Sequence, residues 1–408
     1  MKVLKLSLSL FLAYSSLALA NENNKSFDSY ISDLKKEQFN YDYEKNEAES
    51  SKLRDSWIAP LQLNYTYSKS KPYEEEQTNE SAAIRMDQPI FQSGGIYYGI
   101  KFANASKRYS DYSIDVAKRK LIKDTVSILM QIKQIGFKIE AQKLQITNSE
   151  INLAQKKEQY LSGQLDSGFL DNAVIQRNIV ISALYDLETS KERLITNFST
   201  LSDLDYKSAK IPHLEYISSA EFIQHNIVLK QNDAQIAKND YYKNVTLAKY
   251  LPKVNLTAGY NWSKSEQQFA SDQPAFTNDL NYYDYGVRVS MPLDFNSLRD
   301  MESVKVDYLK SKVVRADKQR ELKALFEQVF HNIDNFDKKI ALSNENREIY
   351  SKLLKDTKEL FVAGYKTQED VDTLANSLEI QKLDSKVYEI DKQLSLLSLY
   401  EMYVNEGE

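Results

Sequence analysis

Four short segments of the chain alternate apolar and polar residues with a period of two. The apolar positions are Leu61, Leu63, Tyr65 and Tyr67; Ile84 and Met86; Val254, Leu256, Ala258, Tyr260 and Trp262; and Tyr283, Tyr285, Val287, Val289 and Met291. Because successive side chains of a β-strand point to opposite faces, each segment is predicted to be a strand with one apolar and one polar face. Runs of about ten residues also match a tilted strand that crosses a lipid bilayer.

Such strands fit two interpretations: a sheet half-buried on a soluble core, or a β-barrel wall that faces lipid. Aromatic residues near the loop end of each predicted hairpin favour the barrel, because outer-membrane barrels carry aromatic girdles at their interfaces. Long polar outer loops are predicted beyond them, at 69–81 and 264–281. The predicted girdle consists of Tyr65, Tyr67, Tyr260, Trp262, Tyr283 and Tyr285.

Each predicted strand pair is followed by a long stretch without proline. Residues 95–160 and 296–361 contain none, and their apolar residues recur every three or four positions. A helix over each whole stretch would reach roughly 100 Å at 1.5 Å per residue. The same periodicity at 180–201 and 371–397 predicts returning helices and coiled-coil seams. Packing in a simple helical bundle accounts for the same stripes but not for the strands.

The same order of features occurs twice, which predicts a duplicated strand-strand-helix-helix unit in a mostly α protein with transmembrane β-strands. Because four strands cannot close a barrel and open edges cannot lie in lipid, the chain either oligomerises or lies outside a membrane. The predicted segments are a helical lead-in at 21–56, a first hairpin of strands at 57–93, a first helical hairpin at 94–205 with its tip near 161–170, equatorial or linker helices at 206–249, a second hairpin of strands at 250–293, and a second helical hairpin at 294–408 with its tip near 362–369.

The first twenty residues have the pattern of a secretory signal peptide. Lys2 and Lys5 precede an apolar run over 6–19, and Ala18-Leu19-Ala20 forms a cleavage site. A short membrane anchor is the alternative, but the run is shorter than the ~20 residues that a spanning helix needs. The chain has no cysteine, so disulfides and thiol chemistry are excluded. The exported chain is therefore predicted to be stabilised by packing alone.

Composition and motifs point away from catalysis. A net charge of −5 offers no basic face for nucleic acid. The three histidines, His213, His225 and His331, lie far from one another in the sequence and no cysteine accompanies them, so no metal site is predicted. No phosphate-binding loop, nucleophile elbow or zinc-protease motif occurs. We therefore expect no enzymatic activity, no cofactor and no nucleic-acid partner.

The junctions between strands and helices, together with the turns between helices, carry a family resemblance. Gln88-Pro89-Ile90-Phe91 with Gly94-Gly95 in the first half, and Met291-Pro292-Leu293 in the second, resemble the passage from barrel strand to channel helix in the TolC family of outer-membrane efflux proteins. Ala363-Gly364-Tyr365 followed by Asp370-Val371 is similar to the family's helix-turn-helix tip. In the first half Asp171 follows Gly163 at eight positions instead of six, which predicts a two-residue insertion at that tip.

The resemblance implies an assembly as well as a fold. Three copies would form one twelve-stranded barrel in outer-membrane lipid, and their helices would form a tunnel through the periplasm. Pro89 and Pro292 would mark the strand-helix junctions. A periplasmic adaptor protein, linked to an inner-membrane pump, would dock on the tips, which are Ser162, Gly163, Gln164, Ala363, Gly364 and Tyr365.

Acidic residues beyond the second tip narrow the periplasmic entrance in the family. Asp370 matches the first of those positions, whereas Thr373 occupies the second, so a ring would rest on Asp370 with neighbouring Asp372. A carboxylate that stabilises the N-terminus of a helix is the alternative explanation of these residues.

The function expected from these features is that of a passive, trimeric exit duct in the outer membrane. It would serve a tripartite efflux or type I secretion system that moves small molecules, ions or polypeptide. An envelope-associated structural or adhesive coiled-coil protein with a soluble β head is the alternative. The location of the strands separates the two functions, because only the duct needs them in the membrane.

Overall fold

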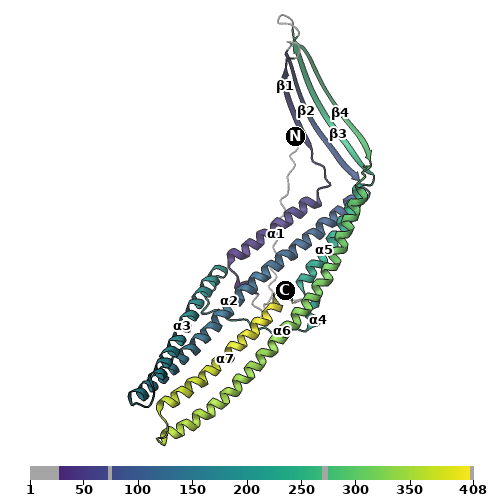
Figure 1. Cartoon of the computed structure of the whole chain (residues 1–408). Coiled ribbons are helices and arrows are strands. Elements are labelled where there is room, and N and C mark those ends of the chain that lie inside the picture. Colours follow the sequence, from purple (N-terminus) through teal and green to yellow (C-terminus); the bar gives the residue numbers. More distant parts are fainter. Residues whose placement is uncertain (1–26, 72–75, 269–273, 405–408) are drawn as a thin grey trace, which may run out of the picture.

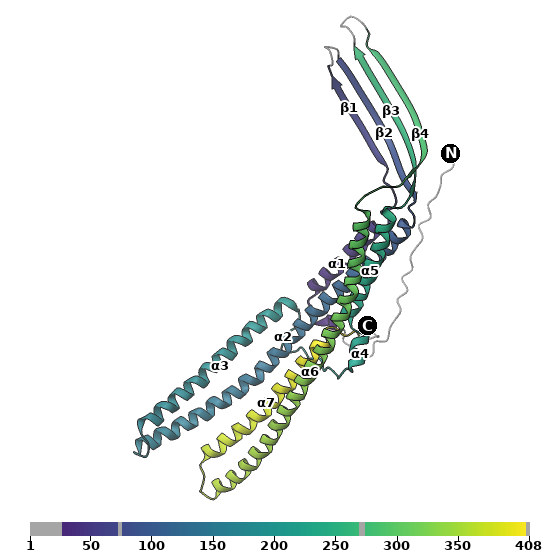
Figure 2. The same ribbon diagram turned by 45° about the vertical axis from the view of Figure 1, so that its right-hand side comes forward.

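The computed structural model describes residues 27–71, 76–268 and 274–404, so the predicted signal peptide at 1–20 lies outside the described residues. Figures 1 and 2 show an elongated molecule with a curved β-sheet at one end and two helical hairpins at the other. Across the described ranges, no helix carries an apolar stretch long enough to cross a membrane.

The sheet has four antiparallel strands in the order β1-β2-β3-β4. They are β1 (Gln62–Ser70), β2 (Glu76–Phe91), β3 (Lys253–Gln268) and β4 (Phe276–Ser290). All four predicted strands are therefore confirmed, but three are longer than expected. The long outer loops predicted at 69–81 and 264–281 are wrong, because most of those residues pair across the sheet, as Thr78 does with Glu266.

Two helical hairpins extend from the sheet, as predicted. The first consists of α2 (Gly95–Leu161) and α3 (Ser167–Leu201), and the second of α6 (Ser297–Val362) and α7 (Gln368–Tyr400). The long helices α2 and α6 have 67 and 66 residues, so each spans roughly 100 Å. α7 packs against both α2 and α6, which joins the second hairpin to the first.

A helix also opens each repeat. α1 (Asp33–Arg54) precedes β1 and lies within the segment expected to lead into it, and α5 (Ile227–Lys249) precedes β3 in the same way. The sequence placed α5 in an equatorial belt, but in the structure it lies along α2 and α6. The repeat is thus helix-strand-strand-helix-helix. The belt consists of residues 202–218, with α4 (Ser219–Gln224), beside the short helix η1 (Phe27–Tyr30) and the C-terminal end of α7.

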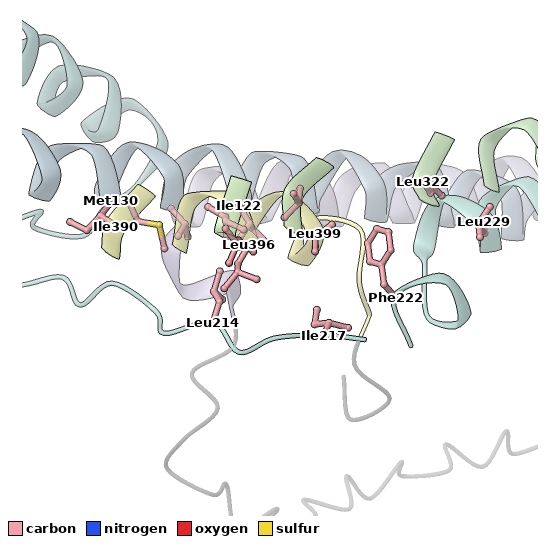
Figure 3. Packing of buried hydrophobic residues seen from close by; sticks show 14 of the residues in the cluster. Ile122, Met130, Leu214, Ile217, Phe222, Leu229, Leu322, Ile390, Leu396 and Leu399 are labelled. Carbon is pink, nitrogen blue, oxygen red and sulfur yellow. The ribbon is translucent and has the colours of Figure 1, made fainter. Parts of the chain in front are cut away.

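The main hydrophobic core lies at the level of this belt, midway along the helices (Figure 3). Phe222 and Leu399 are fully buried there, and Leu396 is 1% exposed. The residues come from α2, α5, α6 and α7 and from the belt, so they join both repeats. Several residues of the predicted seams, including Ile132, Val329 and Ile333, are buried as expected.

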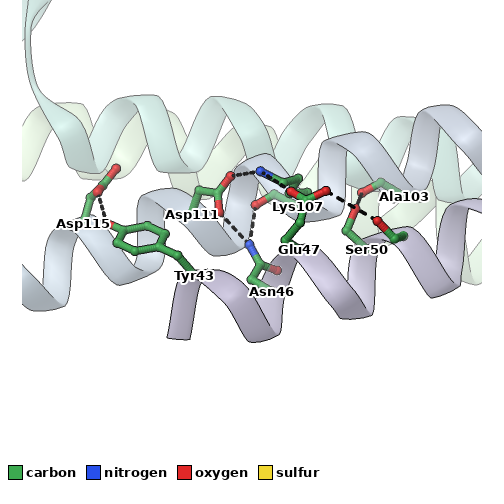
Figure 4. A network of polar contacts seen from close by, with 9 residues as sticks. Tyr43, Asn46, Glu47, Ser50, Ala103, Lys107, Asp111 and Asp115 are labelled. Carbon is green, nitrogen blue, oxygen red and sulfur yellow. Dashed lines mark hydrogen bonds and ion pairs between the residues drawn. The ribbon is translucent and has the colours of Figure 1, made fainter. Parts of the chain in front are cut away.

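α1 is joined to α2 mainly through polar contacts (Figure 4). The Tyr43 hydroxyl donates to the Asp115 carboxylate, and Lys107 pairs with Glu47 at 3.1 Å and with Asp111 at 3.0 Å. Burial, followed by the bond to Asp115, raises the pKa of Tyr43 well above its usual range. The neutral phenol therefore remains the donor over the physiological range of pH.

Candidate functional site

One face of the sheet exposes rows of apolar side chains, whereas its charged residues Glu80, Lys264 and Asp279 lie in the row of Tyr67, nearer the strand ends. Directly opposite residues of antiparallel strands share a face, and the row Leu63, Ile84, Tyr260 and Tyr283 runs across all four strands. Tyr283 is 75% exposed and Tyr285 is 82% exposed. A soluble sheet normally buries such a face against a core. Here no described helix covers it, as Figure 1 shows.

The predicted aromatic girdle lies on this face, at a different height from the one expected. Trp262 lies opposite Ala82, and β3 continues beyond it to Gln268. The aromatic residues therefore lie near the middle of the strands and not at their loop ends. Tyr283 and Tyr285 stack with ring centroids 6.4 Å apart, and Trp262 is partly buried.

The opposite face of the sheet is polar and internally bonded. Asp87 accepts a hydrogen bond from Asn255 Nδ2 at 2.7 Å and pairs with Arg288 at 2.8 Å. One row further, Asp284 accepts from Asn261 Nδ2 at 2.7 Å, and Arg85 donates to Asn261 Oδ1 at 3.2 Å. The polar phase of the strands is visible in the sequence, but these contacts are not. The pairing register, which sets Asp87 opposite Thr257 and within reach of Asn255, could not be read from one segment.

The first strand-helix junction lies at the predicted proline and is held by two neighbouring residues, Gln88 and Ser93. Pro89 is in β2, where the pairing shifts between Pro89 and Phe91, a place where a missing N–H is tolerated. The Gln88 amide accepts from the Ala59 N–H at 3.0 Å and donates to the Trp57 carbonyl at 3.1 Å. Ser93 has a φ of 48° and donates to the Pro252 carbonyl at 2.6 Å.

The second junction is built differently. Pro292 lies just beyond β4, and the helix α6 starts at Ser297. Asp294 Oδ1 accepts from the Asn296 N–H at 2.8 Å, which turns the chain into α6. Tyr250, at the end of α5, donates its hydroxyl to the Asp300 carboxylate of α6. That bond raises the pKa of Tyr250 to about 12, so the tyrosine joins α5 to α6 as a neutral donor.

The two helical tips have the same backbone geometry. Gly163 and Gly364 both have positive φ, at 73° and 81°. In each tip the glycine N–H bonds to the carbonyl three residues back, and the next N–H reaches five residues back. This is the Schellman arrangement, which closes the end of a helix and favours glycine.

No insertion exists at the first tip. Asp166 caps α3 three residues after Gly163, and Thr367 caps α7 three residues after Gly364. The position that corresponds to Asp370 is thus Phe169, and Asp171 corresponds to Asp372. The predicted two-residue insertion was wrong because the two halves were aligned on the nearest Asp and not on the glycine of the turn.

Asp370 and Asp372 are both engaged at the start of α7. Asp370 forms a capping box with Thr367: the Thr367 hydroxyl accepts from the Asp370 N–H at 3.3 Å, and Asp370 Oδ2 accepts from the Thr367 N–H at 3.2 Å. Asp372 Oδ1 accepts from Gln368 Nε2 at 2.7 Å. These bonds agree with the carboxylate that stabilises a helix start, and their role at an entrance stays a prediction.

Among the described residues, no group of three His, Cys, Asp or Glu side chains could hold a metal ion. The functional features of this part of the chain are therefore two sheet faces, two junctions and two exposed tips. All of them are surfaces.

Comparisons with known proteins agree with this organisation. Residues 219–402 match the family model described as outer membrane efflux protein. No curated protein matches the chain at the level of sequence. The solved outer membrane channel CmeC of Campylobacter jejuni has a TM-score of 0.69 and 13% identity over 97% of this chain and 93% of that one.

Two further solved structures share the fold. The outer membrane protein VceC of Vibrio cholerae has a TM-score of 0.65 and 14% identity over 90% of this chain and 93% of its own. The MtrE outer membrane channel of Neisseria gonorrhoeae has a TM-score of 0.64 and 11% identity over 92% and 87%. The family match over residues 219–402 and the shared fold of these channels confirm the resemblance to outer membrane efflux proteins that the junctions and tips predicted.

Proposed function

We propose that three copies of this chain form a passive exit duct that crosses the outer membrane and the periplasm. The observation that carries the proposal is the exposed apolar face of the sheet, which packs against no described helix. In an outer membrane this face lies against lipid, and the bonded polar face lines the lumen. An adhesive or structural protein with a soluble β head would need to cover the same face with protein.

The open edges of the sheet support assembly into a ring. β1 and β4 are the two edge strands, and neighbouring strands alternate in direction. β4 of one copy can therefore pair antiparallel with β1 of the next, a head-to-tail contact that closes when the rotation is cyclic. Closure satisfies every backbone edge group, as lipid requires. Three copies give the twelve strands expected from the family resemblance.

The helical tips support docking of a periplasmic adaptor. Leu161, Val362 and Tyr365 are large apolar residues next to the tip glycines, and Val362 is 86% exposed. Both tips have open space around their glycines, so an adaptor helix can approach the backbone closely. An inner-membrane pump would then supply the energy for transport, and cargo would leave through the lumen.

Asp370 and Asp372 are proposed to favour cations at the periplasmic entrance. Single-channel reversal potentials of an Asp370→Asn protein test this role. Lower cation preference is expected, and an unchanged preference would leave Asp370 with its capping role alone.

Cysteine cross-linking tests the duct, because the natural chain contains no cysteine. Leu63→Cys on β1 is combined in turn with Tyr283→Cys, Tyr285→Cys and Val287→Cys on β4, all on the same face. At least one pair is expected to yield covalent dimers and trimers in outer-membrane fractions. Leu63→Cys with Leu256→Cys, on the inner strand β3, serves as the control and is expected to yield none.

Fractionation provides the opposing outcome. A duct should leave the outer membrane only with detergent and migrate as a heat-modifiable trimer. A monomer that high salt releases into water would overturn the proposal and support the envelope-associated coiled-coil protein.

A further inference from the structure

The strand β4 interrupts the polar face of the sheet with three apolar residues. Phe276, Leu280 and Tyr282 lie at even spacings along it, with Asn278 between the first two, and are 65%, 50% and 49% exposed. Their neighbours across β3 are polar: Leu280 lies opposite Ser263, and Tyr282 lies opposite Asn261. We call these three β4 residues the apolar lane.

The pairing register places the apolar lane on the bonded polar face and not on the lipid face. Tyr282 shares its row with Asn261, whose side chain bonds to Asp284 on the polar face. Pairing between β3 and β4 continues without a shift from Ser290 to Phe276. Leu280 and Phe276, at even steps from Tyr282, therefore share its face.

The wall around the apolar lane carries no charge within the described strands. All charged residues of the polar face lie nearer the helices, at Tyr282's row or below: Lys253, Arg85, Asp87, Asp284 and Arg288. Arg288 is paired with Asp87. In the rows of the apolar lane, β1, β2 and β3 present Ser, Thr, Asn, Gln and Ala. Among the described strands, no charged side chain lies in these rows.

We propose that the apolar lane is a weak binding strip for aromatic solutes on their way out of the barrel. The inference rests on the proposed function, because the lane lines a lumen only in the closed barrel. An uncharged wall leaves apolar contact and ring stacking as its means of holding a solute. Each of the three copies contributes one lane, and the partly hydrated strips hold a solute briefly and release it.

Block of ion current by an aromatic probe tests the strip. Channels of the full-length protein are recorded in planar bilayers, and tetraphenylphosphonium is added on the barrel side. Tetraethylammonium, which has no ring, is the comparison probe. In the natural protein, tetraphenylphosphonium should block at a lower concentration than tetraethylammonium. The double variant Leu280→Ser with Tyr282→Ser should raise its half-blocking concentration by about tenfold.

A matched variant controls for changes in lumen shape. Asn64→Ser with Thr66→Ser alters the same two rows on β1 and should leave the block unchanged. Leu280→Gln with Tyr282→Gln keeps longer side chains than serine and should weaken the block like the serine variant, which keeps the test valid if the serine variant fails to assemble.

The outcomes separate this inference from the proposed function. If the natural protein forms no channel, both the binding strip and the exit duct are overturned. A channel that both probes block equally, or whose block changes less than twofold in both lane variants, overturns the strip and leaves the duct in place.

Discussion

The returning helices α3 and α7 hold equivalent places in the two repeats but pack differently. α7 buries Leu383, Leu396 and Leu399, among others, and none of its large apolar side chains is exposed. α3 buries only Ala173 and Phe198 along its length, while Ile179 is 55% exposed. α7 lies against α2 and α6, whereas α3 lies along α2 and stands apart from the other helices (Figure 2).

The two repeats therefore share the same order of elements but not the same packing of their returning helices. The second repeat lies beside the first, and α7 packs against α2. The first repeat has no repeat on its other side within the chain, so the outer side of α3 keeps its apolar residues exposed. In the proposed ring, a neighbouring copy supplies the missing surface, and α3 then becomes the counterpart of α7 between copies.

The largest expected effect separates a buried residue of α7 from an exposed residue of α3. Leu396→Ala should lower the free energy of unfolding by about 3 kcal/mol, because the side chain leaves a cavity in the belt core. Ile179→Ala should change it by less than about 0.5 kcal/mol in the monomer but weaken the trimer band on heating. Urea unfolding in detergent, followed by circular dichroism, measures the first effect. Equal losses in both monomeric variants would contradict the comparison.

Alternation and period were enough to predict the strands and the helical hairpins. Leu63 and Tyr65 define the face of β1, and the glycines at 163 and 364 define the tips. The strand ends were missed because Glu76 to Ser81 and Ser263 to Gln268 are polar at every position. Where both faces of a strand are hydrophilic, the period of two disappears from the sequence even though the backbone still pairs.

Other features depend on tertiary contacts that one sequence does not reveal. α5 resembles a linker helix in its composition, and only its packing on α2 and α6 shows that it opens the second repeat. The capping role of Asp370 could have been suspected, since Thr367 precedes it by three positions. Ser93 gave no such signal, because its left-handed backbone accompanies a bond to the Pro252 carbonyl, which is distant in the sequence.

The tip glycines provide the opposite test, since substituting them should have the same effect on stability in both repeats. Gly163→Ala and Gly364→Ala should each cost about 1–2 kcal/mol, because an L residue is strained at positive φ and no neighbour within 4 Å adds a clash. Gly168→Ala, in the first turn of α3, is the control and should not destabilise the protein. Urea unfolding measures all three. A cost at only one tip would show that the tips are not equivalent.

A smaller effect should distinguish the helix starts at the two tips. Thr367→Ala removes the capping box of α7 and should cost about 1 kcal/mol. Asp166 accepts no capping bond from a backbone N–H of α3 and bonds only to the Ser167 hydroxyl at 3.3 Å, so Asp166→Ala should cost a few tenths of that. Hydrogen exchange of the two tips measures the difference, and Thr367→Ser should retain protection. Equal loss of protection at both tips would remove the distinction.

The smallest effect concerns the helices that open the repeats, and it is confined to alkaline solution. Tyr43 joins α1 to α2 and Tyr250 joins α5 to α6, each through an Asp. The bond to Asp300 raises the pKa of Tyr250 from its ordinary value of 10.0 to about 12, so folding favours the neutral phenol. Its contribution to stability is then fully present below pH 10 and is lost as the pH rises toward 12.

Tyr250→Phe should therefore unfold at a lower urea midpoint than the natural protein at pH 8. The difference between the two midpoints should shrink at pH 11. Tyr185→Phe, at an exposed position of α3, is the matched control. A difference that stays constant from pH 8 to pH 11 would mean that the Tyr250 hydroxyl contributes through packing and not through its bond to Asp300. In that case α5 would be held as α7 is, by burial, and the polar attachment would belong to α1 alone.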